Sequence, residues 1–129
     1  MEKTTTTLKD LKPGGFVLIE DAPCRVEKLE KSKSGKHGAA KARLDAIGIL
    51  DNKRRSIVKP ADENIDVPII LKKKAQVLSI TGDKAQLMDM ITYEVFELDI
   101  PEEVKGQLVA GNEFNYFEVA DVRTLKQLK

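Results

Sequence analysis

Short apolar runs, each about the length of one strand, alternate with turn-forming residues through the first half of the chain. Residues 16–20 (FVLIE) lie between a Pro13-Gly14-Gly15 turn and a second turn at 21–23. Residues 24–28 (CRVEK) alternate apolar and polar side chains, which is the period-two pattern of a half-buried strand. Several short strands separated by such turns predict a small β-barrel.

The second half has its own set of strand patterns. Residues 99–106 carry the signals of one short helix, with Pro101 at the first helical position and Gly106 past its end. The turn Thr81-Gly82-Asp83 is typical of a hairpin. Five strands interrupted by one short helix indicate an OB-fold barrel, a fold that does not by itself assign a function. The expected strands are 75–80, 84–90, 92–98, 112–120 and 122–128.

A polar stretch separates the two halves. Residues 59–68 are bracketed by Pro60 and Pro68 and show little pattern, so we expect them to be partly a loop. A domain boundary at the end of this stretch gives domains 1–68 and 69–129. The sequence therefore predicts an all-β protein of two small barrels.

Composition limits the class of protein further. The chain has 129 residues, of which 41% are hydrophobic and 33% charged, as in a globular protein. No apolar run approaches the roughly 18 residues that cross a membrane, and residues 1–7 lack the apolar centre of a signal peptide. Cys24 is the sole cysteine, and we interpret it as a small buried apolar residue. We expect a cytoplasmic protein that has no contact with membrane.

Catalytic motifs are missing from the sequence. Gly35-Lys36 is followed by His37, and the position five before Gly35 is Glu30, so the phosphate-binding loop pattern fails at both ends. One histidine and one cysteine do not make a transition-metal site within one chain. We therefore expect no enzyme activity, no metal and no cofactor.

Basic residues concentrate in one segment. The net charge is +1, yet residues 31–43 hold five basic residues and no acidic one. Such a cluster suggests a focused contact with a polyanion, although a solvated loop kept soluble by lysines is an alternative. The five are Lys31, Lys33, Lys36, Lys41 and Arg43.

Lys36 lies between two glycines in this segment. Gly35 and Gly38 permit positive φ angles and a close approach of backbone. Residues 24–28 and 42–45 can pair as antiparallel strands, which puts Lys36 near the tip of a long hairpin. The pattern favours a cation held out from a barrel, and an ordinary mobile hairpin is the alternative.

The segment closely resembles the hypusination loop of the translation initiation factor 5A family of archaea and eukaryotes. The matching residues are 34–41 (SGKHGAAK). The flanks 12–16 (KPGGF), 23–26 (PCRV) and 42–49 (ARLDAIGI) also resemble the family. The resemblance covers essentially the whole chain and implies an SH3-like domain followed by an OB-fold domain. Ala39, where eukaryotic members often have a second histidine, is similar to the archaeal type.

The resemblance also implies a function. Lys36 would receive the aminobutyl group of spermidine from deoxyhypusine synthase and so carry deoxyhypusine or hypusine. The factor, as a monomer, would bind the ribosome at rRNA and peptidyl-tRNA. The modified side chain would reach the tRNA acceptor end and promote peptide-bond formation on stalled ribosomes, notably at consecutive prolines. Ser34, Gly35, His37 and Gly38 would shape the modification loop (about 31–41), and we assign phosphate contacts to Lys33, Lys41 and Arg43.

A second hypothesis is a general RNA- or single-stranded-DNA-binding module that acts through its OB-fold. Bases would then stack on exposed aromatic residues such as Phe114 or Tyr116. The run Lys72-Lys73-Lys74 could contact rRNA, or it could be a solubilising run on an edge strand.

Overall fold

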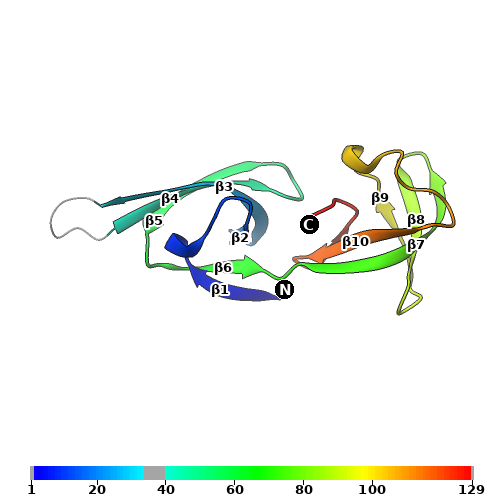
Figure 1. Cartoon of the computed structure of the whole chain (residues 1–129), viewed down its shortest axis with the longest axis horizontal. Coiled ribbons are helices and arrows are strands. Elements are labelled where there is room, and N and C mark those ends of the chain that lie inside the picture. The colour runs from blue at the N-terminus through cyan, green and yellow to red at the C-terminus, as the bar shows by residue number, and fades with distance from the viewer. Residues whose placement is uncertain (1, 34–39, 129) are drawn as a thin grey trace. The chain divides into compact units, whose positions relative to one another are not determined.

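The computed structural model describes residues 2–33 and 40–128 and is almost entirely β-structure (Figure 1). The chain divides into two compact units, Met1–Ile69 and Ile70–Lys129. The all-β class with an SH3-like barrel followed by an OB-fold barrel is confirmed. Within the described ranges, no helix is long and apolar enough to span a bilayer.

Unit 1 is built on a four-stranded antiparallel sheet. Its strands follow the chain in the order β2 (Phe16–Ile19), β3 (Ala22–Lys33), β4 (Ala40–Gly48) and β5 (Arg54–Pro60). Alternate residues of β4 are buried, as the period-two pattern requires. They join a core with residues from the other strands and from the 3-10 helix η1 (Leu8–Asp10), including Leu8, Val17, Cys24, Val26, Ala42, Leu44 and Ala46.

A second, two-stranded sheet completes unit 1. It pairs β1 (Lys3–Thr7) with β6 (Asn64–Pro68). β1 contains four consecutive threonines, whose β-branched side chains favour extended backbone. The expectation that 59–68 is partly a loop is confirmed, because residues 61–63 connect β5 to β6, although this loop is only three residues long. Pro60 and Pro68 occupy the last positions of their strands, where a missing N–H group is tolerated.

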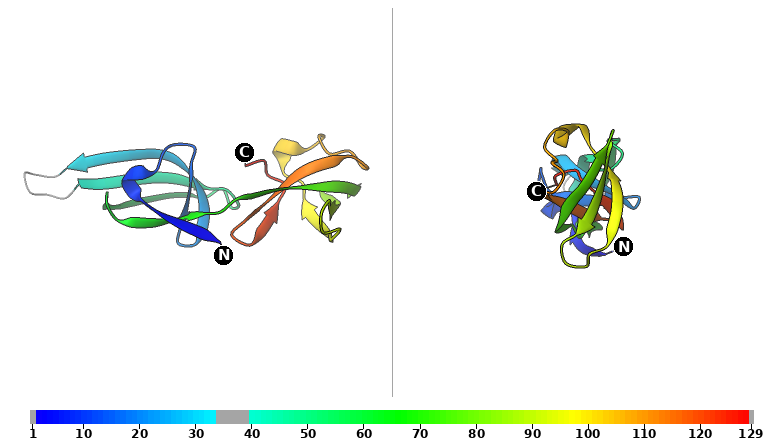
Figure 2. Two further views of the ribbon diagram at one scale, coloured as in Figure 1. Left: turned by 60° about the horizontal axis from the view of Figure 1, so that its bottom comes forward. Right: turned by 90° about the vertical axis from the view of Figure 1, so that its right-hand side faces the viewer.

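Unit 2 is one five-stranded antiparallel sheet in the order β11-β10-β7-β8-β9. The strands are β7 (Leu71–Thr81), β8 (Lys84–Asp89), β9 (Val95–Asp99), β10 (Glu113–Val119) and β11 (Val122–Thr124). The curled sheet can be followed in two orientations in Figure 2. Its core includes Ala75, Val77, Ala85, Leu87, Tyr116 and Leu125.

A single arginine joins the two edge strands of this sheet. Arg123 of β11 donates hydrogen bonds from Nη1 and Nη2 to the two carboxylate oxygens of Glu94, at 2.7 and 2.9 Å. Its guanidinium also lies 4.4 Å from the ring centroid of Phe96 in β9. The barrel is thus closed by side chains where β9 and β11 meet.

Several elements of unit 2 are shorter than the sequence predicted. The helix is a single 3-10 turn, η2 (Glu102–Val104), with Pro101 at its N-cap rather than inside it. The strand expected at 92–98 begins at Val95, because the preceding residues form a turn. The strand expected at 122–128 ends at Thr124.

Candidate functional site: the β3–β4 hairpin

The predicted hairpin between 24–28 and 42–45 is confirmed, and its paired length is greater than the sequence indicated. β3 and β4 pair from Cys24 opposite Gly48 to Lys33 opposite Ala40. The connection between the strands is therefore residues 34–39. The predicted modification residues Ser34, Gly35, Lys36, His37 and Gly38 all fall in this connection and lie outside the residues that the structure describes.

β4 is held from both sides up to its first residue. β5 pairs along its other edge from Ile47 opposite Arg54 to Lys41 opposite Pro60. The backbone N–H of Ala61 then donates to the carbonyl of Ala40 over 2.9 Å. The strand that leads into residue 40 is thus a central strand, which is stiffer than the arm of an isolated two-stranded hairpin.

Two basic and two acidic residues lie together on the outward face of the hairpin, so their charges cancel. Lys28 pairs with Glu30 on β3 at 2.7 Å, and Arg43 contacts Asp45 on β4 at 3.5 Å. The strand register also puts Glu30 opposite Arg43 and Lys28 opposite Asp45. Because two carboxylates surround Arg43, its charge is partly offset before any phosphate approaches.

Hydrogen bonding stabilises the ionised form of Asp45. The Ser56 hydroxyl on β5 donates to Asp45 Oδ1 over 2.5 Å, and this bond lowers the pKa of the carboxyl. The hydrogen bond to Glu30 raises the pKa of Lys28 in turn. Both groups are therefore charged near neutral pH.

Two lysines nearer the hairpin end have no acidic residue opposite them. Lys41 is opposite Ser32, and Lys31 is opposite Ala42. Both are exposed, and neither forms an ion pair with another of the described residues. Of the predicted phosphate contacts, Lys41 fits this role better than Arg43. Lys31 belongs to the basic cluster of the sequence but was not among the predicted phosphate contacts.

The third predicted phosphate contact is Lys33. Its backbone ends β3 opposite Ala40, which places the residue at the end of the hairpin. Its assignment as a phosphate contact stays a prediction.

A tight polar contact fixes the opposite end of the hairpin. Arg55 binds Asp51 through Nη2 at 2.8 Å, and its Nη1 lies 4.0 Å from the sulfur of Cys24. A Cβ atom on Gly48 would lie 2.0 Å from Oδ1 of Asp51, so a larger residue there must displace the Asp51 side chain. Cys24 is fully buried, as expected, and burial raises the pKa of its thiol.

Tyr116 and Phe114, the two aromatic residues named for the second hypothesis, do not provide the stacking surface that it needs. Tyr116 is only 1% exposed, and its hydroxyl donates to buried Asp89. Phe114 is partly buried against the same core. The stacking role suggested for Tyr116 was therefore wrong, because a barrel of this size fills its interior with its own aromatic side chains.

The lysine run of unit 2 lies near the start of β7. β7 pairs with β10 over Leu71–Gln76, but its ladder with β8 begins only at Ala75. Lys72 and Lys73 therefore have a ladder partner on one side alone, which fits the interpretation of a run at a strand edge. Lys73 forms an ion pair with Glu118 at 3.1 Å, and Lys74 forms one with Glu113 at 3.4 Å. An rRNA contact by this run would have to compete with these carboxylates.

A family model described as "Translation initiation factor 5A-like, N-terminal" matches residues 2–63. The translation initiation factor 5A of Archaeoglobus fulgidus is 48% identical over 126 residues, covering 98% of both chains. The translation initiation factor 5A of Methanocella arvoryzae is 53% identical over 114 residues, covering 88% of this chain and 89% of the relative.

Solved structures agree with these sequence matches. A eukaryotic translation initiation factor 5A from Methanococcus jannaschii superposes with a TM-score of 0.85 at 41% identity, covering 95% of this chain and 91% of the other. An initiation factor 5A family protein from Naegleria fowleri gives a TM-score of 0.76 at 27% identity, covering 96% of each. The chain belongs to the translation initiation factor 5A family.

Proposed function

We propose that the chain is a ribosome-binding translation factor that acts through a modified Lys36. The observation that carries this proposal is the β3–β4 hairpin, whose central strand is paired on both sides up to Ala40 and whose connection contains Lys36. Relatives that match almost the whole chain are named translation initiation factor 5A, which supports a role in translation. Such a hairpin suits a side chain that must act at a distance from its own domain.

The proposed modification is the transfer of an aminobutyl group from spermidine by deoxyhypusine synthase. The Nζ atom of Lys36 forms a bond to the terminal carbon of the four-carbon chain, and the bond between that carbon and the secondary amine of spermidine breaks. The three-carbon diamine leaves with the proton that Nζ loses. The side chain becomes longer and carries two protonated amines near neutral pH. The product is deoxyhypusine, and a later hydroxylation would give hypusine.

The described residues of the hairpin would position this side chain rather than perform chemistry. Lys41 and Lys31 form no ion pair with another described residue, so they suit phosphate groups of tRNA or rRNA. Holding the acceptor end of peptidyl-tRNA in place lowers the entropic part of the barrier to peptide-bond formation. This help matters most at consecutive prolines, because proline stiffens the nascent chain. The ribosome remains the catalyst.

Mass spectrometry of the peptide that spans residues 33–41, from protein purified out of its native cells, tests the modification. We expect an aminobutyl increment on Lys36, with or without one added oxygen. Unmodified Lys36 in cells that contain the synthase would overturn the proposal.

A reconstituted translation reaction on a message with consecutive proline codons tests the activity. Modified protein should relieve the stall, whereas the Lys36→Arg variant should not. Titration of the unmodified protein with free RNA or DNA oligonucleotides separates this function from general nucleic-acid binding, which predicts tight binding without modification.

A further inference from the structure

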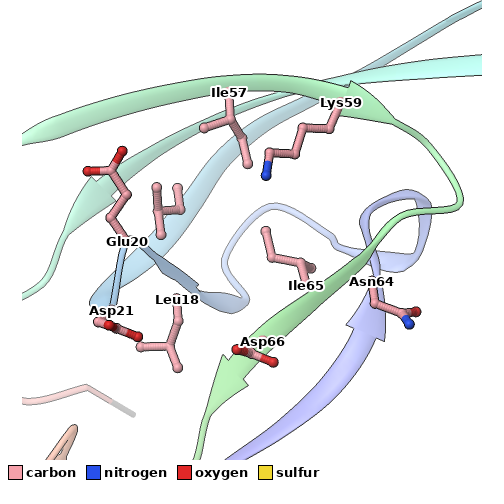
Figure 3. Close-up of a pocket in the computed structure, with 9 residues that line it drawn as sticks. Leu18, Glu20, Asp21, Ile57, Lys59, Asn64, Ile65 and Asp66 are labelled. Atoms are coloured by element: carbon pink, nitrogen blue, oxygen red, sulfur yellow. The ribbon is translucent and has the colours of Figure 1, made fainter.

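Unit 1 has a groove between its two-stranded and its four-stranded sheet. The groove has a volume of about 300 Å³ and lies between β5, β6 and the turn from β2 to β3. Figure 3 shows Ile57 and Lys59 of β5 projecting toward Ile65 of β6 across it. A volume of this size is at the small end for a binding site and fits a few side chains.

The base of the groove is aliphatic. Leu18 is 5% exposed, and Ile57 and Ile65 pack partly buried against the core of unit 1. These side chains offer a surface for an aliphatic group of a ligand, whose burial there would remove further apolar area from water.

The rim of the groove is acidic, on a unit that is otherwise basic. Residues 1–69 contain 14 lysine and arginine residues against 11 acidic ones, a net charge of +3. The groove nonetheless has three carboxylates, Glu20, Asp21 and Asp66, and one lysine, Lys59.

Internal ion pairs leave two of these carboxylates uncompensated. Asp66 binds Lys3 at 3.2 Å, and Lys59 binds Glu63 at 3.2 Å. Glu20 and Asp21 are exposed and form no ion pair or hydrogen bond through their side chains with other described residues. The available charge at the groove is therefore negative.

Strand edges border the same groove. Within the described part of the chain, β5 pairs only with β4, and β6 pairs only with β1. Each strand thus has a second edge without a ladder partner. An unpaired edge offers backbone N–H and C=O groups to an added strand.

We propose that this groove binds a short extended peptide of a partner protein in which lysine or arginine alternates with aliphatic residues. The aliphatic side chains enter the groove between Ile57 and Ile65, and the basic side chains pair with Glu20 and Asp21. The peptide backbone pairs with the free edge of β5. The charge complementarity selects a basic partner, and the aliphatic base and strand edge select a peptide over a simple polycation.

The test uses the full chain and a fluorescent hexapeptide of alternating lysine and valine, blocked at both ends. We expect a dissociation constant on the order of 100 μM at low salt, as suits a small interface with exposed charges. Backbone amide shifts in NMR should concentrate at Glu20, Ile57 and Ile65. An absence of binding up to about 1 mM, or shifts spread over unit 2 instead, would overturn the proposal.

Matched variants locate the charge contribution. Glu20 and Asp21 both have positive φ angles, at 50° and 64°, which asparagine adopts readily. The double variant Glu20→Asn/Asp21→Asn should therefore keep the turn and weaken peptide binding about fivefold or more. Asp121→Asn removes a carboxylate from the equivalent turn of unit 2, where Ala120 and Asp121 have φ angles of 50° and 63°. It should leave binding unchanged, and an equal loss in the two variants would overturn the site.

Two further measurements distinguish peptide binding in the groove from misfolding and from binding of charge alone. Lys59→Gln removes a competing cation and should tighten binding about twofold, a gain that misfolding cannot produce. A peptide with N-methyl groups on all its backbone amides cannot donate hydrogen bonds to the edge of β5 and should bind at least fivefold more weakly. If the methylated peptide and spermidine bind as well as the parent peptide, the groove recognises charge alone and the peptide proposal is wrong.

Discussion

The hydroxyl of Tyr116 in β10 donates its hydrogen bond to Oδ2 of Asp89 at the end of β8. The other carboxylate oxygen, Oδ1, accepts hydrogen bonds from the backbone N–H groups of Ile91 and Thr92, both at 2.8 Å. One buried carboxylate thus connects a core strand to the turn that leads into β9. Tyr116 therefore has a structural role in this unit, and not the base-stacking role suggested for it from the sequence.

The first prediction follows from the ionisation of Asp89. The three hydrogen bonds, the one from Tyr116 foremost, lower its pKa from 3.8 to about 2. A carboxyl with a lowered folded-state pKa stabilises the protein above its unfolded pKa and loses this contribution as the pH falls from about 4 to about 2. The loss amounts to about 2 kcal/mol.

Urea unfolding at pH 7 and at pH 2.5 measures this effect. The Asp89→Asn variant should be less stable at pH 7 and should lose less stability on acidification than the parent protein. Identical acid sensitivity in the two proteins would show that Asp89 does not titrate as described. Asp99→Asn, at an exposed position on the same sheet, is the control.

The second prediction concerns closure of the OB-fold barrel. Replacing Arg123 with alanine removes the two bonds to Glu94, an ion pair with Glu118 at 3.3 Å and the contact over the Phe96 ring. We expect the free energy of unfolding to fall by about 1–3 kcal/mol. Lysine at this position should restore only part of the loss, because it cannot form the bidentate pair.

The matched control for Arg123 is Lys84→Ala. Lys84 binds Asp99 at 3.0 Å on the surface of the same unit, and exposed pairs of this kind contribute less than about 1 kcal/mol. Chemical denaturation monitored by tyrosine fluorescence reports both variants. A loss for Arg123→Ala no larger than the loss for Lys84→Ala would contradict a closing role.

The third prediction concerns Gly48 at the base of the hairpin. A methyl group there meets Oδ1 of Asp51 at 2.0 Å and Nη1 of Arg55 at 2.8 Å. Gly48→Ala must displace this ion pair and should lower stability by about 1–3 kcal/mol. In an Asp51→Ala background the alanine at 48 should cost clearly less, and this non-additivity is the test. Additive losses would mean that Gly48 is required for another reason.

The fourth prediction separates the two cations of β4 in ribosome binding. Lys41→Ala should weaken binding and lower the salt dependence by about one phosphate contact. Arg43→Ala should have a smaller effect, because Glu30 and Asp45 already offset its charge. Sedimentation with ribosomes over a series of salt concentrations measures both. A larger effect at Arg43 than at Lys41 would contradict this assignment.

Local pattern was enough to predict part of this structure. The alternation in 24–28 and 42–46 gave the central hairpin, because its apolar residues must all lie on one face of the sheet. The glycine-containing turn at 81–83 gave the β7–β8 hairpin for the same local reason. The motif around Lys36 predicts this residue as the modification site. Lys36 lies outside the described residues, between the ends of β3 and β4, so this assignment stays a prediction.

Other features depended on contacts between distant residues. How much of 59–68 is a loop could not be predicted, because prolines such as Pro60 and Pro68 occur in edge strands as well as in loops. The sequence of the lysine run at 72–74 does not show where the ladder with β8 begins, so it could not be predicted that the rest of β7 becomes a central strand from Ala75 onward. The pair of Arg123 with Glu94 joins residues 29 positions apart, and only closure of the barrel brings them together.

The double pairing of β4 makes the hairpin sensitive to the parity of its length. Side chains alternate between the two faces of a strand, so inserting or deleting one residue between Lys41 and Leu44 would turn Lys41 toward the side that Ala42 and Leu44 now share. Removing two residues from β4, with two from each neighbouring strand, would shorten the hairpin while keeping every face. Length variation within such an arm is therefore expected in steps of two residues, matched across all three strands.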